Sequence, residues 1–263
     1  MAQIIAIANN KGGCGKTTTA ANLAAAWAAR GFDVLCVDLD AQSNLTAALR
    51  CAPAPGRTSY DALKGVKCSF IEPYPVEVLG SGRFDLLPAV RDLAAVEAGL
   101  SAAPDRLTRL ASYLDIYRPR YDAILIDTPP AIGVLSVAAL YAADAAIIAV
   151  QPEFLAARGL VQIAASLDAL RAVRPAPLDA RVLFTLYDKR KSLHRLTAEQ
   201  IKGAGFAVLS SVVRPCVALA EAPAAGVDIF RYSPRSNGAA DYKAVADEYA
   251  QTIKLKHHKH NNQ

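Results

Sequence analysis

The sequence predicts an α/β fold in which a mostly parallel, twisted sheet is covered by helices on both faces. Short runs of Val, Ile and Leu alternate along the chain with alanine-rich stretches, as buried parallel strands alternate with crossover helices. The chain has 263 residues, 53% of them apolar, which is enough to enclose one large core. We therefore expect one domain over residues 1–254, followed by a basic, disordered tail over 255–263.

The first elements follow from local patterns. The apolar run QIIAIA predicts a buried strand over 3–8, and a glycine-rich turn separates it from an alanine-rich helix over 16–30 that Gly31 closes. The next strand, 33–38, ends in the acidic run VDLDAQ. The segment 51–77 is rich in Pro and Gly and lacks periodicity, so we expect surface loops with one short helix.

The same alternation continues to the end of the chain. A strand at 84–87 and helices at 92–99 and 105–117 precede the most apolar strand, 121–126, which stops at the sequence Asp-Thr-Pro-Pro. The remaining pattern predicts strands at 145–150, 181–186 and 207–213, with helices between them. It also predicts a last helix at 239–254.

A glycine-rich loop lies between the first strand and the first helix, which is the context of a phosphate-binding loop. Its glycines let several backbone N–H groups converge on phosphate oxygens, and the helix start adds its positive dipole end. In such a loop Lys16 reaches the β- and γ-phosphates of ATP, and the Thr17 hydroxyl binds Mg²⁺. The expected nucleotide contacts are Lys11, Gly12, Gly13, Cys14, Gly15, Lys16, Thr17 and Thr18.

The loop departs from the ordinary GxxxxGK[ST] form, because Asn10 replaces a glycine and a second lysine, Lys11, precedes the glycines. This variant, KGGxGKTT, resembles the ParA/MinD family of P-loop ATPases, and specifically its short, Soj-like members. The resemblance covers nearly the whole chain, through VDLDAQSN, YDAILIDTPPAIGVLSVAAL, AADAAIIAVQPEF and ALAEAPAAGVDIFRYSPRSNGAADY. It implies a P-loop NTPase fold and a role for Lys11 in binding the phosphates held by a partner subunit.

Acidic residues follow two of the strands. Asp38 and Asp40 follow the second strand and Asp127 ends the strand 121–126, at the sheet edge where ligands bind in open α/β folds. Asp127 is placed to hold Mg²⁺ through water, as a Walker B acid does, or to cap the next helix. The resemblance implies that Asp40 orients the attacking water and that Asp38 lies near the Mg²⁺ shell, although Ala41 replaces the family's usual proline. The expected catalytic residues are Lys11, Lys16 and Asp40, and the expected metal site is Thr17, Asp38 and Asp127.

The basic excess lies in the second half of the chain. Residues 151–263 contain 16 Lys and Arg against 10 Asp and Glu, whereas residues 1–150 contain 13 against 14. Such a surface permits polyanion binding, and scattered surface charge explains the same count. The resemblance implies DNA contacts on two stretches, through Lys189, Arg190, Lys191, Arg214, Arg231 and Arg235. It also implies that adenine binds near Arg214 and Pro215, while Ala218 replaces a family arginine.

The resemblance implies a weak ATPase that DNA and a partner protein stimulate. In such proteins ATP closes a homodimer, the dimer binds double-stranded DNA without sequence preference, and a ParB-like or other adaptor links it to a cargo. The cargo is a plasmid, a chromosome origin or a large protein assembly. The sequence has no apolar run of about 18 residues and no signal peptide. We therefore expect a cytoplasmic, nucleoid-associated protein with no membrane partner.

Two other functions of P-loop ATPases fit this sequence less well. A MinD-like ATPase at the membrane surface needs an amphipathic C-terminal helix. The last helix instead has a thin apolar stripe that suits core packing: Tyr242, Val245, Tyr249 and Ile253. A reductase like the nitrogenase iron protein needs cysteines in the middle of the chain, and none occurs between Cys68 and Cys216. Trp27 is expected in the core. The His-rich tail, 256–260, has the composition of a metal site or of a solvated end.

Overall fold

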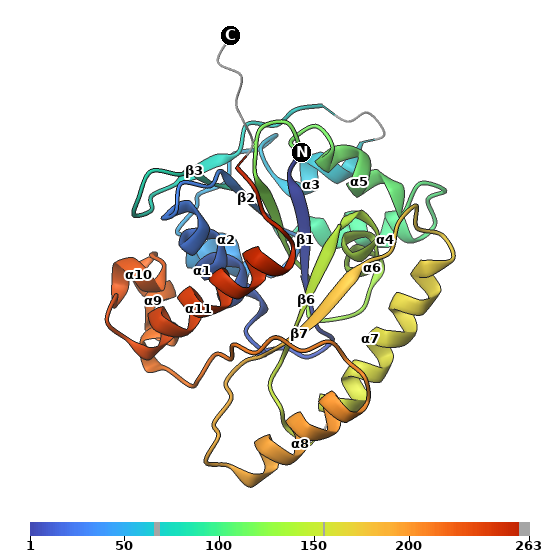
Figure 1. Ribbon diagram of the computed structural model, residues 1–263. Coiled ribbons are helices and arrows are strands. Elements are labelled where there is room, and N and C mark those ends of the chain that lie inside the picture. The colour runs from blue at the N-terminus through green and yellow to red at the C-terminus, as the bar shows by residue number, and fades with distance from the viewer. Residues whose placement is uncertain (66–68, 155, 258–263) are drawn as a thin grey trace.

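Seven strands form one sheet in the computed structural model, which describes residues 1–65, 69–154 and 156–257 (Figure 1). The strand order is β3–β4–β2–β5–β1–β6–β7, and every neighbouring pair is parallel except the edge pair β3–β4. The strands are β1 (Gln3–Ala8), β2 (Val34–Asp38), β3 (Tyr74–Val76), β4 (Phe84–Leu87), β5 (Ala123–Asp127), β6 (Ala145–Val150) and β7 (Asp179–Phe184). The mostly parallel sheet predicted from the sequence is confirmed.

Helices cover both faces of this sheet, as predicted (Figure 1). One face is covered by α1 (Lys16–Ala28), α2 (Asn44–Ala48), α9 (Val217–Ala225), α10 (Ile229–Tyr232) and α11 (Asn237–Thr252). The other is covered by α3 (Ser59–Lys64), α4 (Leu93–Ser101), α5 (Thr108–Leu114), α6 (Val134–Ala142), α7 (Ala156–Arg171) and α8 (Ser192–Gly203). The described part of the chain thus has two apolar layers, one on each side of the sheet.

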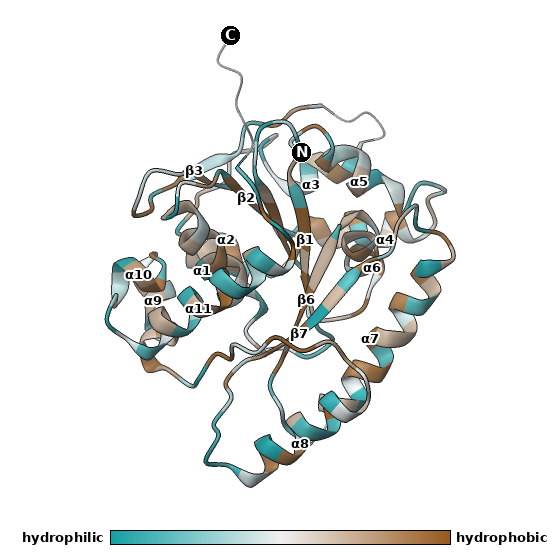
Figure 2. Ribbon diagram, in the orientation of Figure 1, coloured by the Kyte–Doolittle hydropathy of each residue, from teal (hydrophilic) through white to brown (hydrophobic). Residues whose placement is uncertain are grey.

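The central strands are buried on both faces, so they are continuous apolar runs rather than alternating ones. In β1, Ile5 and Ile7 pack toward α1 and α11, whereas Ile4 and Ala6 belong to the opposite apolar layer. Figure 2 shows the consequence, with apolar colouring along the central strands and mixed colouring on outer helices such as α8.

Trp27 lies in the core, as expected. Its side chain is fully buried, its indole Nε1 donates a hydrogen bond of 3.0 Å to the carbonyl oxygen of Ala246, and its ring stacks on Tyr249 with centroids 6.4 Å apart. Tyr242 and Val245, from the apolar stripe of the last helix, are buried in the same layer. The α11 stripe therefore packs against α1 and the sheet.

The predicted strand at 207–213 was wrong. Only Val208 forms an isolated bridge, to Val182 of β7, and the segment runs beside β7 as irregular chain. The backbone N–H groups of Ser210 and Ser211 donate instead to the carboxylate of Glu248 on α11, at 2.6 and 2.7 Å. Leu209 and Val213 still donate to the carbonyl oxygens of Val182 and Phe184 at 2.9 Å, but the N–H groups bound to Glu248 interrupt the pattern between them, so no continuous ladder forms.

Two short elements were not predicted. The edge strand β3 lies in the segment expected to hold loops and one helix, and it pairs antiparallel with β4. The helix α2 follows the acidic run and begins after Ser43, whose φ is +54°. The expected short helix is α3, which begins with a capping box between Thr58 and Asp61.

Candidate nucleotide-binding site

The phosphate loop connects β1 to α1 and has the backbone that its glycines allow. Gly13 and Gly15 have φ of +73° and +86°, in the left-handed region that glycine adopts without steric cost. Lys16, the first residue of α1, is 7% exposed, and its Nζ donates to the carbonyl oxygen of Lys11 at 3.2 Å. The Lys16 ammonium is therefore folded over the loop, where phosphate oxygens bind in such a motif.

Thr185, at the end of β7, supports the loop and was not among the predicted residues. Its Oγ1 donates a hydrogen bond of 2.7 Å to the carbonyl oxygen of Cys14. The two residues are far apart in the chain, so no local sequence pattern connects them. This bond fixes the phosphate loop to the end of β7.

Asp127 and Thr17 meet at the carboxyl edge of the sheet. Thr17 Oγ1 donates to Asp127 Oδ2 at 2.7 Å, while Asp127 Oδ1 is buried without a hydrogen-bond partner. Burial, and then the charge of Asp38, raise the pKa of Asp127 well above its ordinary value. An unpartnered buried carboxylate oxygen beside a hydroxyl is the donor set that a hydrated Mg²⁺ needs. The residues fit the metal site expected from the sequence.

Asp38 is the neighbour of Asp127 across β2 and β5, where the two residues are in register. Its Oδ2 accepts the Thr46 N–H at 2.9 Å and the Thr46 hydroxyl at 2.7 Å, and its Oδ1 accepts the N–H of Asp40 at 3.0 Å. Burial raises the pKa of Asp38 to about 6, against the opposing effect of the hydrogen bonds from Thr46. Thr46 is thus a supporting residue that no sequence motif indicates.

Asp40 lies two residues beyond the end of β2 and lines the cleft beside the loop. Its Oδ1 accepts the N–H of Gln42 at 2.9 Å, and its Oδ2 accepts a hydrogen bond of 3.3 Å from the Asn44 side chain. Both partners belong to the same run, VDLDAQSN, so local sequence fixes the direction of this carboxylate.

Lys11 points away from the phosphate loop of its own chain. Its Nζ lies 2.5 Å from Oε2 of Glu153, just after β6, and the two side chains are 47% and 45% exposed. The hydrogen bond from Lys11 lowers the pKa of Glu153. The structure thus separates the two loop lysines: Lys16 is buried over the loop, and Lys11 is at the surface.

A cleft of about 380 Å³ runs from the phosphate loop to the segment before α9. At the loop end it is lined by Gly12, Gly13, Gly15, Lys16, Thr17, Thr18 and Asp40. At the other end the lining is mainly apolar, with Leu186, Val213, Cys216, Leu219 and Ala220. Arg214 and Pro215, the residues expected near adenine, lie between two lining residues, Val213 and Cys216.

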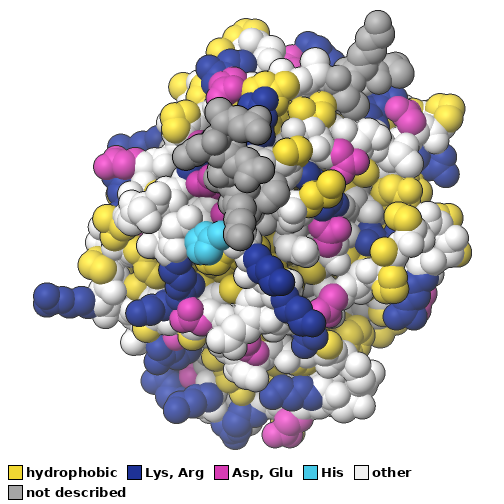
Figure 3. All heavy atoms as spheres, turned by 45° about the horizontal axis from the view of Figure 1, so that its top comes forward, with side chains coloured by type: hydrophobic (Ala, Val, Ile, Leu, Met, Phe, Trp, Pro, Cys, Tyr) yellow, Lys and Arg dark blue, Asp and Glu magenta, His cyan; other side chains and the backbone are white. Residues whose placement is uncertain are grey.

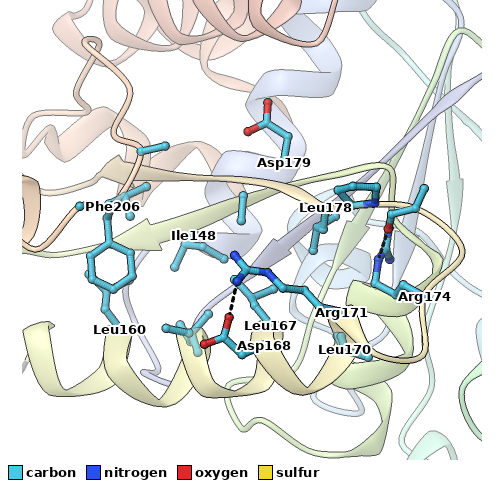
Figure 4. Close-up of a pocket in the computed structure, with 18 of the residues that line it drawn as sticks. Ile148, Leu160, Leu167, Asp168, Leu170, Arg171, Arg174, Leu178, Asp179 and Phe206 are labelled. Atoms are coloured by element: carbon cyan, nitrogen blue, oxygen red, sulfur yellow. Dashed lines mark hydrogen bonds and ion pairs between the residues drawn. The ribbon is translucent and has the colours of Figure 1, made fainter.

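A larger hollow, of about 770 Å³, lies between α7 and β7 (Figure 4). Its wall is mostly apolar, with Leu160, Leu167 and Phe206, and the ion pair of Arg171 with Asp168 stands at its side. None of the residues predicted to bind phosphate or metal lines it. The cleft at the phosphate loop is therefore the candidate site, although it is the smaller of the two.

The residues expected to contact DNA fall in two places. Lys189, Arg190 and Lys191 are exposed on the connection between β7 and α8, whereas Arg231 lies on α10 and Arg235 just after it (Figure 1). In the view of Figure 3, Lys and Arg side chains are most frequent toward the lower left, with Asp and Glu among them.

Several of these guanidinium groups already have acidic partners. Arg190 is 85% exposed and forms a two-point contact with Asp188, at 2.9 and 3.0 Å. Arg231 is held by the carbonyl and carboxylate oxygens of Glu77. These pairs lower the net positive charge that each place presents to a polyanion.

Comparisons with known proteins identify relatives of the whole chain. A family model described as an AAA domain matches residues 2–177. The chain is 36% identical over 251 residues to the chromosome partitioning protein ParA of Caulobacter vibrioides, covering 94% of this chain and 93% of the relative. It is 38% identical over 258 residues to the sporulation initiation inhibitor protein Soj of Bacillus subtilis, covering 95% and 99%.

A solved structure shows the same fold with nucleotide bound. Cobyrinic acid a,c-diamide synthase from Mycobacterium smegmatis, determined with an ATP analog and magnesium, superposes with a TM-score of 0.79 at 31% identity. The match covers 97% of this chain and 96% of the other.

Proposed function

The chain belongs to the ParA/Soj family of ATPases, and from this premise we propose that it binds ATP and Mg²⁺ in the cleft at the phosphate loop and hydrolyses the nucleotide. ATP closes two copies into a sandwich dimer, and the dimer binds double-stranded DNA without sequence preference. A ParB-like or other cargo adaptor then stimulates hydrolysis and release. One observation carries the proposal, namely that a single phosphate loop holds a buried lysine, Lys16, and an exposed lysine, Lys11.

The nucleotide is held by the loop backbone and by Lys16, which already lies over the loop. Thr17, Asp127 and Asp38 are the residues that would hold Mg²⁺, the first with its hydroxyl and the other two with their carboxylates. When bound, Mg²⁺ neutralises the charge that develops on the β- and γ-phosphate oxygens. The base lies at the apolar end of the cleft, near Arg214 and Pro215.

Hydrolysis requires a water molecule aligned with the γ-phosphate, and Asp40 is the carboxylate that orients it. The hydrogen bonds from Gln42 and Asn44 hold Asp40 in one direction at the wall of the cleft. Donors that hold a carboxylate in one direction lower the reorganisation that it needs during the reaction. Lys11 supplies the second charge at the phosphates, from the partner copy.

The DNA-binding surface is formed by the basic residues after β7 and around α10, namely Lys189, Arg190, Lys191, Arg231 and Arg235. Each chain offers few such groups, and two of them, Arg190 and Arg231, are already paired with acids. A dimer doubles the number of phosphates neutralised and counterions released, so DNA affinity depends on ATP. Binding to bulk chromosomal DNA places the protein on the nucleoid, where it moves a plasmid, a chromosome origin or a large protein assembly.

The alternative, a MinD-like ATPase at the membrane surface, is less well supported. The apolar stripe of α11 is taken up by core contacts, with Tyr242, Val245 and Tyr249 fully buried. In the described residues, no helix combines the length and the apolar character needed to cross a bilayer. Binding to anionic lipid vesicles in the presence of ATP, with no binding to DNA, would favour the alternative.

The two loop lysines provide the test. Lys16→Ala should abolish ATP binding, whereas Lys11→Ala should keep nucleotide binding in the monomer and lose the ATP-dependent dimer. Light scattering with ATP measures the dimer, and a fluorescent ATP analogue measures binding. Lys202→Ala, which removes an exposed lysine at the end of α8, is the matched control. A Lys11→Ala protein that dimerises normally would refute the role of Lys11 across the interface.

A further inference from the structure

We infer that Asp241 is a positioning residue for the nucleotide base, because it holds the segment that forms the apolar end of the cleft. The inference rests on the proposed nucleotide site and adds to it a residue of α11, remote in sequence from the phosphate loop. The sequence suggests two roles for Arg214, nucleotide binding and DNA binding, and the inference assigns Arg214 to nucleotide binding.

The Asp241 carboxylate binds both the backbone and the side chain of Arg214. Its Oδ2 accepts the Arg214 backbone N–H at 2.9 Å, and its Oδ1 accepts the guanidinium Nη2 at 2.6 Å. The guanidinium Nε lies 3.1 and 3.0 Å from the two oxygens. Asp241 is only 8% exposed, and its carboxylate oxygens accept hydrogen bonds from Arg214. Together these contacts fix the position and direction of the chain at residue 214.

The segment that Asp241 holds carries two lining residues of the cleft, Val213 and Cys216. Val213 is anchored to the end of β7, because its N–H donates to Phe184 at 2.9 Å and its carbonyl accepts the N–H of Tyr187 at 3.0 Å. Beyond this anchor, the backbone contact of Arg214 with Asp241 and the restricted φ of Pro215 determine where the chain goes. Cys216 is therefore placed by the Asp241 contact.

The chemistry of the apolar end makes its position important. The polar side chains that line it already have partners: Thr185 donates to the Cys14 carbonyl, and the Tyr242 hydroxyl lies 3.1 Å from Thr19 Oγ1. The base is therefore recognised through shape, apolar contact and backbone groups. An apolar wall contributes to affinity only while it stays in contact with the base, since a small gap forfeits much of the dispersion energy.

Consecutive residues of α11 hold both ends of the cleft. Asp241 holds the base end through Arg214, and Tyr242 contacts Thr19 on α1, the helix that begins with Lys16. One turn of α11 thus contributes to the separation of the base wall from the phosphate loop, together with the end of β7, which contacts Val213 and Cys14. Loss of the Asp241 contact should weaken the binding of the base and leave the binding of the phosphates unchanged.

The test compares ATP with inorganic tripolyphosphate, which has the phosphates and lacks the base. Asp241→Asn removes the charge that holds the guanidinium. In the full chain with Mg²⁺, we expect it to weaken ATP binding by about tenfold, the loss of roughly one charged hydrogen bond. Tripolyphosphate binding should stay within about twofold of the parent. The KM for ATP should rise while kcat at saturating ATP changes little.

Asp144→Asn is the matched control. Asp144 likewise accepts a backbone N–H, from Ile4 at 2.8 Å, and the guanidinium of Arg118 at 2.8 Å, and none of its contacts belongs to the cleft. This substitution should lower stability without changing the ratio of ATP to tripolyphosphate affinity. If Asp241→Asn leaves ATP affinity unchanged, or weakens both ligands equally, the inference is wrong.

Arg214→Gln is the second variant: the Arg214 side chain is half exposed, and glutamine keeps the backbone N–H bond to Asp241 and an amide donor for the carboxylate. We expect weaker ATP binding and, at saturating ATP, DNA binding within about twofold of the parent. The opposite pattern, normal ATP affinity with lost DNA binding, would assign Arg214 to DNA and overturn the inference. Failure of the unmodified protein to bind ATP would refute the proposed function instead, so the two failures are distinct.

Discussion

Replacing Glu153 with glutamine should strengthen ATP-dependent dimerisation, because Glu153 holds Lys11, the lysine that we propose binds the partner's phosphates. The Lys11 Nζ to Glu153 Oε2 distance is 2.5 Å, and both side chains are nearly half exposed. A pair of this exposure is worth about 0.2–1 kcal/mol. In the proposed sandwich both copies would release this lysine on closing, so the cost per dimer would be about 0.4–2 kcal/mol. The dimerisation constant of Glu153→Gln should rise roughly 2- to 30-fold.

Sedimentation equilibrium with ATP measures this change, in an Asp40→Ala background that keeps the nucleotide intact. The gain should shrink at about 0.5 M salt, which screens the exposed pair. Because Lys11 lowers the pKa of Glu153, the carboxylate stays ionised and the gain should be constant between about pH 6 and 8. No gain in Glu153→Gln, or an equal gain after Lys11→Ala, would refute the reasoning.

Three further outcomes follow from the core and the site. Asp40→Ala should stop phosphate release while the ATP dimer persists in light scattering; hydrolysis at the parent rate would move the catalytic role to another acid. Trp27→Ala should cost about 3–5 kcal/mol in chemical denaturation, since the indole is fully buried and bonded to Ala246; a cost below about 1 kcal/mol would contradict the packing. Burial raises the Asp38 pKa to about 6, so the nucleotide-free fold binds this proton more tightly than the unfolded chain. The free energy of unfolding that this proton adds is fully present below the pKa of Asp38 in the unfolded chain, and it is lost as pH rises through about 6. Thermal melts of Asp38→Asn should show a smaller slope, because Asp127, whose pKa burial also raises, still contributes one of the same sign; an unchanged slope would exclude Asp38 as a source.

The sequence predicts where the residues of the candidate phosphate end lie, because the pattern that indicates them is local. The loop needs glycines, a lysine and a threonine in a fixed order between a strand and a helix, and all of them lie between residues 12 and 17. Asp40 and its two partners likewise belong to one short run. The structure places these residues together at the carboxyl edge of the sheet, which a parallel sheet with helices on both faces requires.

The parts that the sequence does not predict depend on contacts between distant segments. Glu153 is 142 residues from Lys11, and Asp241 is 27 residues from Arg214, so no periodicity or motif joins them. The error at 207–213 has the same cause. An apolar run indicates a strand, but the contact between Ser210 and Glu248, 38 residues later, decides the outcome. Tertiary hydrogen bonds outweigh local propensity there.

The proposed cycle is tested most directly by DNA affinity measured with ATP, with ADP and without nucleotide, across a range of salt. A random-sequence duplex should bind tightly only with ATP. If about four to six phosphates are neutralised per dimer, log K should fall with log salt at a slope of about −4 to −5. Arg190→Glu should weaken binding to every sequence and leave dimerisation intact. Equal affinity with ADP, or ATP-independent binding to one preferred sequence, would contradict a DNA-binding dimer switched by ATP.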